Sequence, residues 1–321
     1  MSGSEMNANP LVSVIITNYN YSKYLGEAIE SVLNQSYRNF ELIIVDDGST
    51  DNSTEIIQDY SRIFPNTIIP ILKENGGQAS AFNAGFKASR GDIISFLDSD
   101  DFWKPERLQE IVRAFGKGRY SIVQHNMEIA DEASHSQGKL YRKGLFSGDA
   151  KRLILDYSQL DIFVPTSGVC FIRDALNEIL PVPENWQICA DAFITRIVLF
   201  YGLLYSFEQP LGYYRIHGGN RWMYTERQKK TDIVPFIVDA INKHLADKNM
   251  GFKVDVTKNP LYRYKYIGQR PGLLEPFLIL KMLPFFPFMS FKDKVAVSIQ
   301  LNKIFIVRLH YKLIRLYRSL K

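Results

Sequence analysis

The chain has 321 residues, 46% of them hydrophobic, and a formal net charge of +5. This length and composition provide a sizeable core and exclude a globally disordered protein. The two cysteines, Cys170 and Cys189, fit neither a disulfide framework nor a zinc-ligand spacing, and they favour a reducing compartment.

Positive charge is concentrated at the C-terminal end of the chain. Residues 260–321 carry 12 Lys or Arg against Glu275 and Asp293, a surplus of 10 that leaves −5 for the rest. An acidic body with a basic tail is not expected to bind nucleic acid, so the tail is a separate feature. Residues 1–10 are polar and lack the basic and apolar regions of a signal peptide, so we expect a flexible N-terminus.

Strands and helices alternate through the first third of the chain. Short apolar runs predict strands, and apolar residues at helical spacing predict helices between them. This alternation predicts βαβ units, and hence an α/β fold with a doubly wound, mainly parallel sheet and helices on both faces. The predicted strands are 11–17, 40–45, 67–72 and 92–97, and the predicted helices are 24–34, one capped by Asn52 and Glu55, 78–88, and one opened by Pro105.

Beyond residue 120 the pattern is less regular. Residues 121–130 predict another strand, 131–148 a mobile polar loop, and 166–173 a turn that enters a strand. An apolar run from residue 189 to about 201 predicts a helix, which places Asp191 at or near its first turn.

Polar side chains end three of the predicted strands, at residues 17–19, 46–47 and 98–101. Open α/β sheets bind ligands at the carboxyl ends of their strands, and clustered carboxylates need a hard cation such as Mg²⁺ or Mn²⁺. Each motif alone also fits an ordinary turn or an acidic loop before a helix. Together they favour a nucleotide whose diphosphate is held by metal. Neither a Rossmann fingerprint nor a P-loop motif occurs.

Several motifs occur in order over roughly residues 10–220: VSVIITNYN (12–20), SVLNQSY (31–37), VDDGSTD (45–51), NGGQASAFNAG (75–85), LDSDD (97–101) and PLGYYRIHGGN (210–220). In order and spacing they resemble the motifs of family 2 glycosyltransferases. The resemblance implies the GT-A fold, a nucleotide-diphospho-sugar donor with UDP favoured, a divalent cation, and inversion at the anomeric carbon.

Five positions in the first 100 residues acquire expected roles through this resemblance. Thr17 and Tyr19 would line the base pocket, and Asp47 would read the edge of the nucleobase. Asp98 would lie near the ribose, and Asp100 would be the main metal ligand.

Asp191 matches the position of the family's catalytic base, and the alternative is a carboxylate that only starts a helix. This chain departs from the family's pattern at two positions: Ala190 stands where relatives often carry Glu, and Phe82 stands where many carry Arg. We expect Gln78, near a helix N-terminus, to replace part of the lost contact with donor phosphate.

His217, which precedes two glycines, is expected over the donor diphosphate or in the metal shell, with an ordinary packed histidine as the alternative. Thr166 and Ser167 match a region that borders the acceptor in relatives. The tryptophans are candidates for stacking on sugar rings, although core packing is the safer expectation for each; they are Trp103, Trp186 and Trp222.

The end of the chain is both apolar and basic. Residues 273–291 contain two charges and three prolines, so they make a poor membrane span. Residues 295–321 place apolar residues near helical spacing with basic residues between them, which predicts an amphipathic helix at a membrane surface. The alternative is a helix packed on the domain or on a second subunit of a homo-oligomer.

The sequence therefore predicts a GT-A catalytic domain over 11–225 and a helical, basic extension over 226–321. We expect a metal-dependent inverting glycosyltransferase, cytoplasmic and peripheral at the inner face of the cell membrane. Its acceptor would be a glycan or a lipid-linked hydroxyl in cell-surface polysaccharide synthesis. A sugar-nucleotide pyrophosphorylase, an inactive nucleotide-binding scaffold and a structural membrane adaptor are the alternatives.

Overall fold

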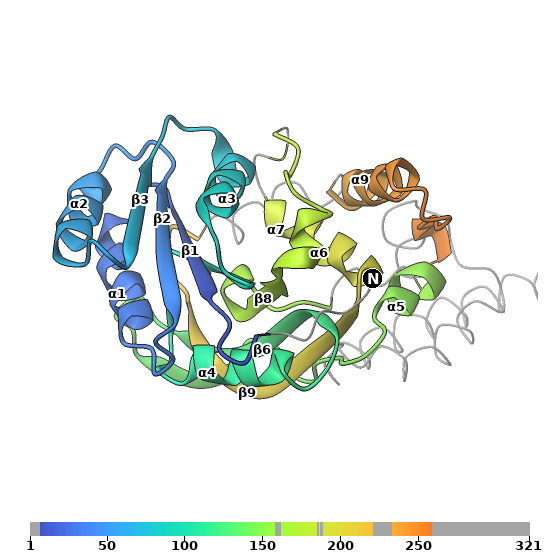
Figure 1. The fold of residues 1–321 in the computed structure, drawn as a ribbon, viewed down its shortest axis with the longest axis horizontal. Helices are drawn as coiled ribbons and strands as arrows, with labels where there is room; N and C mark the ends of the chain where they lie inside the picture. The colour runs from blue at the N-terminus through green and yellow to red at the C-terminus, as the bar shows by residue number, and fades with distance from the viewer. Residues whose placement is uncertain (1–6, 158–161, 185, 187–188, 221–232, 259–321) are drawn as a thin grey trace, which may run out of the picture.

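The computed structural model describes residues 7–157, 162–184, 186, 189–220 and 233–258. Strands of this part of the chain form one curled sheet, in the order β3-β2-β1-β4-β8-β6-β9-β5, with β7 paired to β6 (Figure 1). Their bounds are β1 Val12–Asn18, β2 Phe40–Asp46, β3 Ile68–Leu72, β4 Ile93–Asp98, β5 Phe102–Trp103, β6 Tyr120–Ala130, β7 Ser136–Leu140, β8 Val169–Ile172 and β9 Leu203–Arg215.

The long ladders of this sheet are parallel. Strand β1 lies between β2 and β4, β2 continues to β3, and β6 runs parallel to β9. Shorter antiparallel pairs join β4 to β8, β8 to β6, β9 to β5 and β6 to β7. The predicted mainly parallel α/β sheet is confirmed, with these antiparallel pairs making it a mixed one.

Helices cover both faces of the sheet, as predicted (Figure 1). Apolar side chains of α1, α2 and α4 fill one core cluster, and those of α3, α6, α7 and α9 fill the other. The bounds are α1 Ser22–Leu33, α2 Ser53–Ile63, α3 Gly77–Ala88, α4 Arg107–Phe115, α5 Lys151–Tyr157, α6 Arg173–Asn177, α7 Ala190–Ile197 and α9 Ile233–Asp247, with short 3₁₀ turns at Thr166–Gly168, Val198–Phe200 and Val256–Lys258.

The apolar run of β1 explains why the sheet is covered twice. Val14 and Ile16 belong to the cluster beneath α1, whereas Ile15 between them belongs to the cluster beneath α3. Successive strand residues point to opposite faces, so a continuous apolar run needs a cover on each side. Gly91 lets β4 begin beside β1, because a Cβ there would lie 2.5 Å from the Ser13 nitrogen.

Two predicted helix starts differ in detail. No side-chain cap forms at Asn52; instead Asp51 Oδ1 accepts the Ser53 N–H at 3.0 Å, so the expected capping box is absent. Pro105 lies in a turn, and α4 begins at Arg107, because the short strand β5 intervenes after the acidic segment.

The polar segment 131–148 contains a strand that the sequence does not predict. Strand β7 pairs with β6 through Leu140 opposite Glu128 and Ser136 opposite Ala130. All five β7 residues are exposed, so no apolar alternation marks them. The predicted loop is therefore partly an edge hairpin.

Helix α9 belongs to the predicted C-terminal extension and packs against α7. Its buried Ile241 and Leu245 share a core cluster with Phe193 of α7. The predicted amphipathic helix of residues 295–321 and the N-terminal residues 1–6 lie outside the described residues. None of the helices that the structure describes has the length and apolarity to cross a bilayer.

Two of the three tryptophans are core residues. Trp103 is 4% exposed and donates from Nε1 to the Ser167 carbonyl at 2.8 Å, and Trp186 is 2% exposed against Phe193. Core packing is thus confirmed over sugar stacking for these two, whereas Trp222 lies outside the described residues. Cys170 and Cys189 are both free thiols in the structure.

Candidate active site

The ends of β1, β2 and β4 meet at one edge of the sheet. Thr17 is in register with Val45 of β2 on one side and with Asp98 of β4 on the other. The polar residues that follow these strands therefore emerge side by side. This convergence, expected from the sequence, defines the candidate site.

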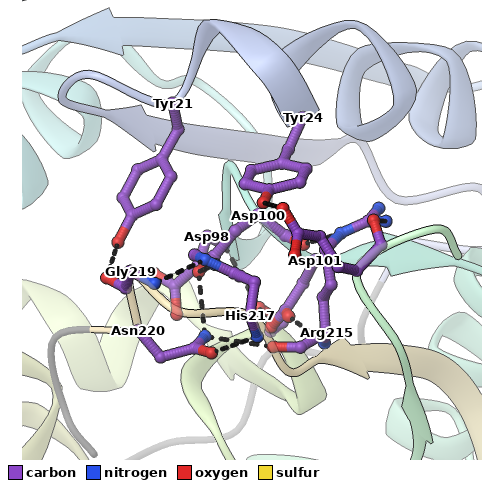
Figure 2. A network of polar contacts seen from close by, with 11 residues as sticks. Tyr21, Tyr24, Asp98, Asp100, Asp101, Arg215, His217, Gly219 and Asn220 are labelled. Carbon is purple, nitrogen blue, oxygen red and sulfur yellow. Dashed lines mark hydrogen bonds and ion pairs between the residues drawn. The ribbon is translucent and has the colours of Figure 1, made fainter.

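Residues Asp98–Asp101 form a tight turn at this edge, hereafter the carboxylate turn (Figure 2). The Asp101 N–H donates to the Asp98 carbonyl at 3.0 Å. Asp101 itself is buried: its Oδ1 accepts the Arg215 N–H at 3.0 Å, and its Oδ2 accepts the Ser167 hydroxyl at 2.6 Å. Burial, then the charges of Asp100 and Asp98, hold the pKa of Asp101 well above its ordinary value. Asp101 is therefore a structural member of the turn.

Asp100 points toward the loop that follows β9 (Figure 2). Its Oδ2 lies 3.1 Å from His217 Nε2 and 3.4 Å from Asn220 Nδ2. The Gly219 N–H donates to His217 Nδ1 at 3.1 Å, a pattern that assigns the proton of a neutral ring to Nε2. The sequence-predicted pair Asp100 and His217 is thus brought into contact.

Two aromatic rings enclose His217, that of Tyr24 in α1 and that of Tyr21, which directly precedes α1. Tyr24 lies 4.7 Å away between ring centroids and Tyr21 lies 5.6 Å away, edge-on. The Tyr21 hydroxyl also donates to the Gly219 carbonyl at 3.0 Å. The His217 side chain is only 3% exposed, so its orientation is fixed by packing as well as by hydrogen bonds.

Asp98 and Asp191 are two half-buried carboxylates whose charges interact. Burial, then the charges of Asp100 and Asp191, raise the pKa of Asp98 well above its ordinary value. Burial also raises the pKa of Asp191, against the opposing effects of Arg196 and a hydrogen bond from the Thr166 side chain. Among the described residues, no group donates a hydrogen bond to the Asp98 carboxylate, which leaves its two side-chain oxygens open to a ligand.

The turn Thr166–Gly168 contacts Asp191 and the carboxylate turn. Thr166 approaches Asp191, and the Ser167 hydroxyl accepts the Asp98 N–H at 3.2 Å while donating to Asp101. The Ser167 carbonyl accepts hydrogen bonds from Trp103 and from the fully buried Arg107, whose Nη2 lies 3.3 Å away. Both Thr166 and Ser167 therefore lie at the site.

Arg215 is the residue that sequence reasoning missed. Its side chain is 1% exposed, and Nε donates to the Asp100 carbonyl at 2.7 Å. The other end of the guanidinium contacts Glu27 of α1 and Ser134. The motif around residues 210–220 contains Arg215, but nothing in the sequence indicates that its partners lie 81 and 188 positions away.

Asp47 lies at the end of β2, away from the carboxylate turn. It accepts from Lys73 Nζ at 2.6 Å and from the N–H groups of Gly76 and Gly77 at 3.0 and 2.8 Å. Gly48 follows with φ +77°, where a Cβ would meet the Asn75 nitrogen at 2.7 Å. These loops border an open recess of about 570 Å³. The half-buried Thr17 and Tyr19 come from the end of β1 beside it.

Gln78 and Phe82 both lie on α3, with different surroundings. Gln78 Oε1 accepts the Ala190 N–H at 2.9 Å, which ties the start of α3 to the start of the helix that carries Asp191. Phe82 is fully buried, and its ring lies 4.4 Å from that of Phe96. Phe82 is thus a core residue.

Two carboxylates of the described residues could contribute to a metal site. Asp98 and Asp100 lie close together at the carboxyl edge of the sheet, and within the described ranges the Asp98 carboxylate accepts no hydrogen bond, an arrangement that would suit a hard cation. No group of three His, Cys, Asp or Glu side chains within the described ranges is arranged to hold a metal by itself. A cation shared between one or two carboxylates and substrate phosphates does not need such a cage.

Comparison with known proteins identifies the chain. It belongs to glycosyl transferase family 2, whose model matches residues 13–180. The uncharacterized glycosyltransferase alr2836 of Nostoc sp. (strain PCC 7120) is 37% identical over 293 residues, covering 88% of this chain and 91% of that protein. The putative teichuronic acid biosynthesis glycosyltransferase TuaG of Bacillus subtilis is 37% identical over 141 residues, or 42% and 56% of the two chains.

Solved structures confirm the GT-A-type fold. TarS residues 1–349 of S. aureus, in complex with UDP, align with a TM-score of 0.59 at 17% identity, covering 85% of this chain and 79% of that one. The mannosyltransferase PcManGT of Pyrobaculum calidifontis, in complex with GDP-Man and Mn²⁺, aligns with a TM-score of 0.52 at 15% identity, covering 93% and 87%.

Proposed function

We propose that this glycosyltransferase moves a sugar from a nucleoside-diphosphate sugar, with UDP as the favoured nucleotide, to an acceptor hydroxyl with inversion. The observation that carries the proposal is the proximity of Asp98 to Asp100 and Asp191 at the carboxyl edge of the sheet, close enough for their charges to interact. Carboxylates that repel one another would be stabilised by a bound cation, and one of them could accept the proton of the acceptor hydroxyl.

The donor would lie along the edge from β2 to β4. Thr17, Tyr19 and Asp47 are proposed to form the base pocket, with Asp98 near the ribose. Asp47 has one oxygen engaged twice and the other once, so it would act on the base largely through the loop it organises. Gln78 keeps its amide nitrogen available for donor phosphate while its oxygen holds Ala190.

Asp100 is proposed as the main ligand of Mg²⁺ or Mn²⁺. Such a cation would neutralise the charge that develops on the leaving nucleoside diphosphate. His217 holds Asp100 in place through a hydrogen bond, and its role toward the cation or the diphosphate depends on releasing that contact.

Asp191 is proposed as the general base that takes the proton of the acceptor hydroxyl. Its raised pKa improves it as a proton acceptor, because a base works best when its pKa approaches the working pH. Thr166, which hydrogen-bonds to Asp191, would orient the carboxylate. Attack from the face opposite the leaving diphosphate inverts the anomeric carbon.

The acceptor is proposed to be a cell-surface glycan or its lipid-linked precursor. The similarity to TuaG, described as a teichuronic acid biosynthesis enzyme, supports this class. We propose the catalytic domain over residues 11–225, and a cytoplasmic enzyme that the basic segment 295–321 attaches to the inner face of the membrane.

A screen of nucleotide sugars tests the proposal. UDP-sugars, GDP-mannose and free UDP are added with MnCl₂ or EDTA while protein melting and donor hydrolysis are measured. We expect UDP compounds with Mn²⁺ to raise the melting temperature and one UDP-sugar to be hydrolysed. Binding without turnover would support an inactive scaffold, and no binding would support a membrane adaptor.

A further inference from the structure

We propose that Glu27 and Arg215 form a positioning pair. In this arrangement Arg215 fixes the backbone of the carboxylate turn, while Glu27 keeps the positive charge of Arg215 from neutralising the turn's carboxylates. The inference rests on the proposed function, because it concerns the cation that Asp100 would bind. Neither residue is assigned a role by the sequence motifs.

The first part concerns position. Arg215 donates from its backbone nitrogen to Asp101 Oδ1 at 3.0 Å and from Nε to the Asp100 carbonyl at 2.7 Å. Both contacts restrain the turn, and neither uses a carboxylate oxygen of Asp100. An arginine at this site therefore orients the turn while leaving the Asp100 carboxylate for a ligand.

The second part concerns charge. Arg215 Nη2 lies 2.5 Å from Glu27 Oε2, and Nη1 donates to the Ser134 hydroxyl at 2.6 Å. Among the described residues, Glu27 is the carboxylate that forms an ion pair with the guanidinium. The Tyr24 and Phe102 rings each lie 4.9 Å from the central guanidinium carbon of Arg215 (Figure 2 shows Tyr24 above Arg215). The planar fork of Arg suits this division of contacts, with one edge toward Glu27 and Nε toward the turn.

The consequence is an acidic turn beside a buried cation. A fully buried guanidinium without a carboxylate partner would be costly and would draw the nearest carboxylate toward itself. Pairing with Glu27 removes that tendency. Loss of the Glu27 charge should therefore let Arg215 compete with a metal ion for Asp100.

Manganese binding tests the inference directly. Free Mn²⁺ is measured by electron paramagnetic resonance as MnCl₂ is titrated into the protein with saturating UDP. We expect Glu27→Gln to weaken Mn²⁺ binding by about 10-fold, the scale of one incompletely screened charge close to an ion. Glu30→Gln is the matched control, because Glu30 lies one turn further along α1 and contacts the Tyr60 hydroxyl at 2.7 Å instead; it should bind Mn²⁺ normally.

Arg215 variants show whether Glu27 acts through Arg215. Arg215→Lys keeps the charge but lacks the fork, so it should also bind Mn²⁺ weakly. In an Arg215→Met background, Glu27→Gln should have no further effect. If Arg215→Met does not fold, the comparison of Glu27→Gln with Glu30→Gln still decides the matter.

The wild-type result separates a failure of the proposed metal function from a failure of the Glu27–Arg215 inference. If the wild-type protein with UDP binds no Mn²⁺, the proposed metal function is wrong and the inference falls with it. If the wild type binds Mn²⁺ and Glu27→Gln binds it equally well, or if Glu30→Gln is weakened to the same extent, the inference alone is wrong.

Discussion

His217 meets Asp100 as a hydrogen-bond donor: Nε2 lies 3.1 Å from Asp100 Oδ2, while Nδ1 accepts the Gly219 N–H at 3.1 Å. A neutral imidazole ligates metal through its unprotonated nitrogen. For Nε2 to serve, the ring proton must move to Nδ1 and the Gly219 contact must break. Asp100 is therefore the better placed of the two predicted metal ligands.

Replacing Asp100 by Ala should abolish the metal dependence of nucleotide binding, because the diphosphate loses its bridging cation. Calorimetry with UDP should give the same affinity for Asp100→Ala in Mn²⁺ and in EDTA, whereas the wild type should bind more tightly in Mn²⁺. Asp59→Ala, at an exposed position on α2, is the control for loss of an acid. Wild-type affinity of Asp100→Ala in Mn²⁺ would contradict the metal assignment.

Replacing Asp191 by Asn should slow transfer by at least about 100-fold, since general-base catalysis is worth roughly 10² to 10⁴ in rate. A base acts mainly in the transition state, so kcat should fall more than donor affinity. Asp174→Asn is a matched control, because Asp174 also lies in the first turn of a helix, α6. Asn also caps helices well, so near-normal turnover of Asp191→Asn would leave Asp191 with a structural role only.

Replacing Asp47 by Asn should weaken nucleotide binding and leave the Mn²⁺ requirement intact. The amide loses the charge that pairs with Lys73 and one of the oxygens that accept the Gly76 and Gly77 N–H groups. The UDP dissociation constant is measured at several Mn²⁺ concentrations. Asp51→Asn, which loosens a neighbouring loop by its contacts to Ser22 and Ser53, separates a general loss of order from a specific one. An unchanged UDP affinity would exclude Asp47 from the base pocket.

Replacing Asp98 by Asn should stabilise the metal-free protein increasingly as pH rises. The pKa of Asp98 is raised in the fold, so its favourable contribution is complete below the ordinary value of 3.8 and is lost as pH rises through the raised value. Asn carries no such dependence. Urea unfolding in EDTA should show little difference in free energy of unfolding between Asp98→Asn and the wild type near pH 4, and a higher free energy of unfolding for Asp98→Asn at pH 8. If the difference in free energy of unfolding between Asp98→Asn and the wild type does not change with pH, ionisation of Asp98 does not destabilise the fold and the prediction is wrong.

Much of the fold follows from residue patterns. Continuous apolar runs such as β1 identify buried strands, and the helices between them appear within two residues of their predicted ends at α1 and α3. Strand β7 was missed because it is an exposed edge strand without apolar alternation. Strand β5 was missed because two residues are too short to show a period.

The sequence indicates which acids lie at the candidate site, but it does not indicate which residues hold them in position. Asp98, Asp100 and Asp191 stand in motifs or at a helix start, and the structure places Asp98 near the other two acids and Asp100 in contact with His217. Arg215 and Glu27 are held by a contact 188 positions long, for which a single sequence carries no signal. The roles of the acids remain predictions that the experiments above address.

Removing residues 291–321 should release the protein from membranes without abolishing transfer to a soluble acceptor. The basic, amphipathic pattern of this segment predicts electrostatic attraction to anionic lipid, which weakens in high salt. Sedimentation with anionic vesicles measures the change, and neutral vesicles are the control. A truncated protein that still sediments, or that fails to fold, would favour packing of this segment on the domain or a second subunit.

The long connections of the carboxylate turn also bear on when the site can assemble. The family model ends at residue 180, and a nascent chain of that length already holds Asp98, Asp100 and Asp101. The groups that orient Asp100 and Asp101 belong to residues 215–220, which lie 114 to 120 positions after these two acids in the sequence. Contacts of such separation form late, because loop closure comes before any stabilisation. We therefore expect the carboxylate turn to reach its final conformation only after β9 has emerged from the ribosome and paired with β6. Until then the charges of its acids repel one another without these contacts.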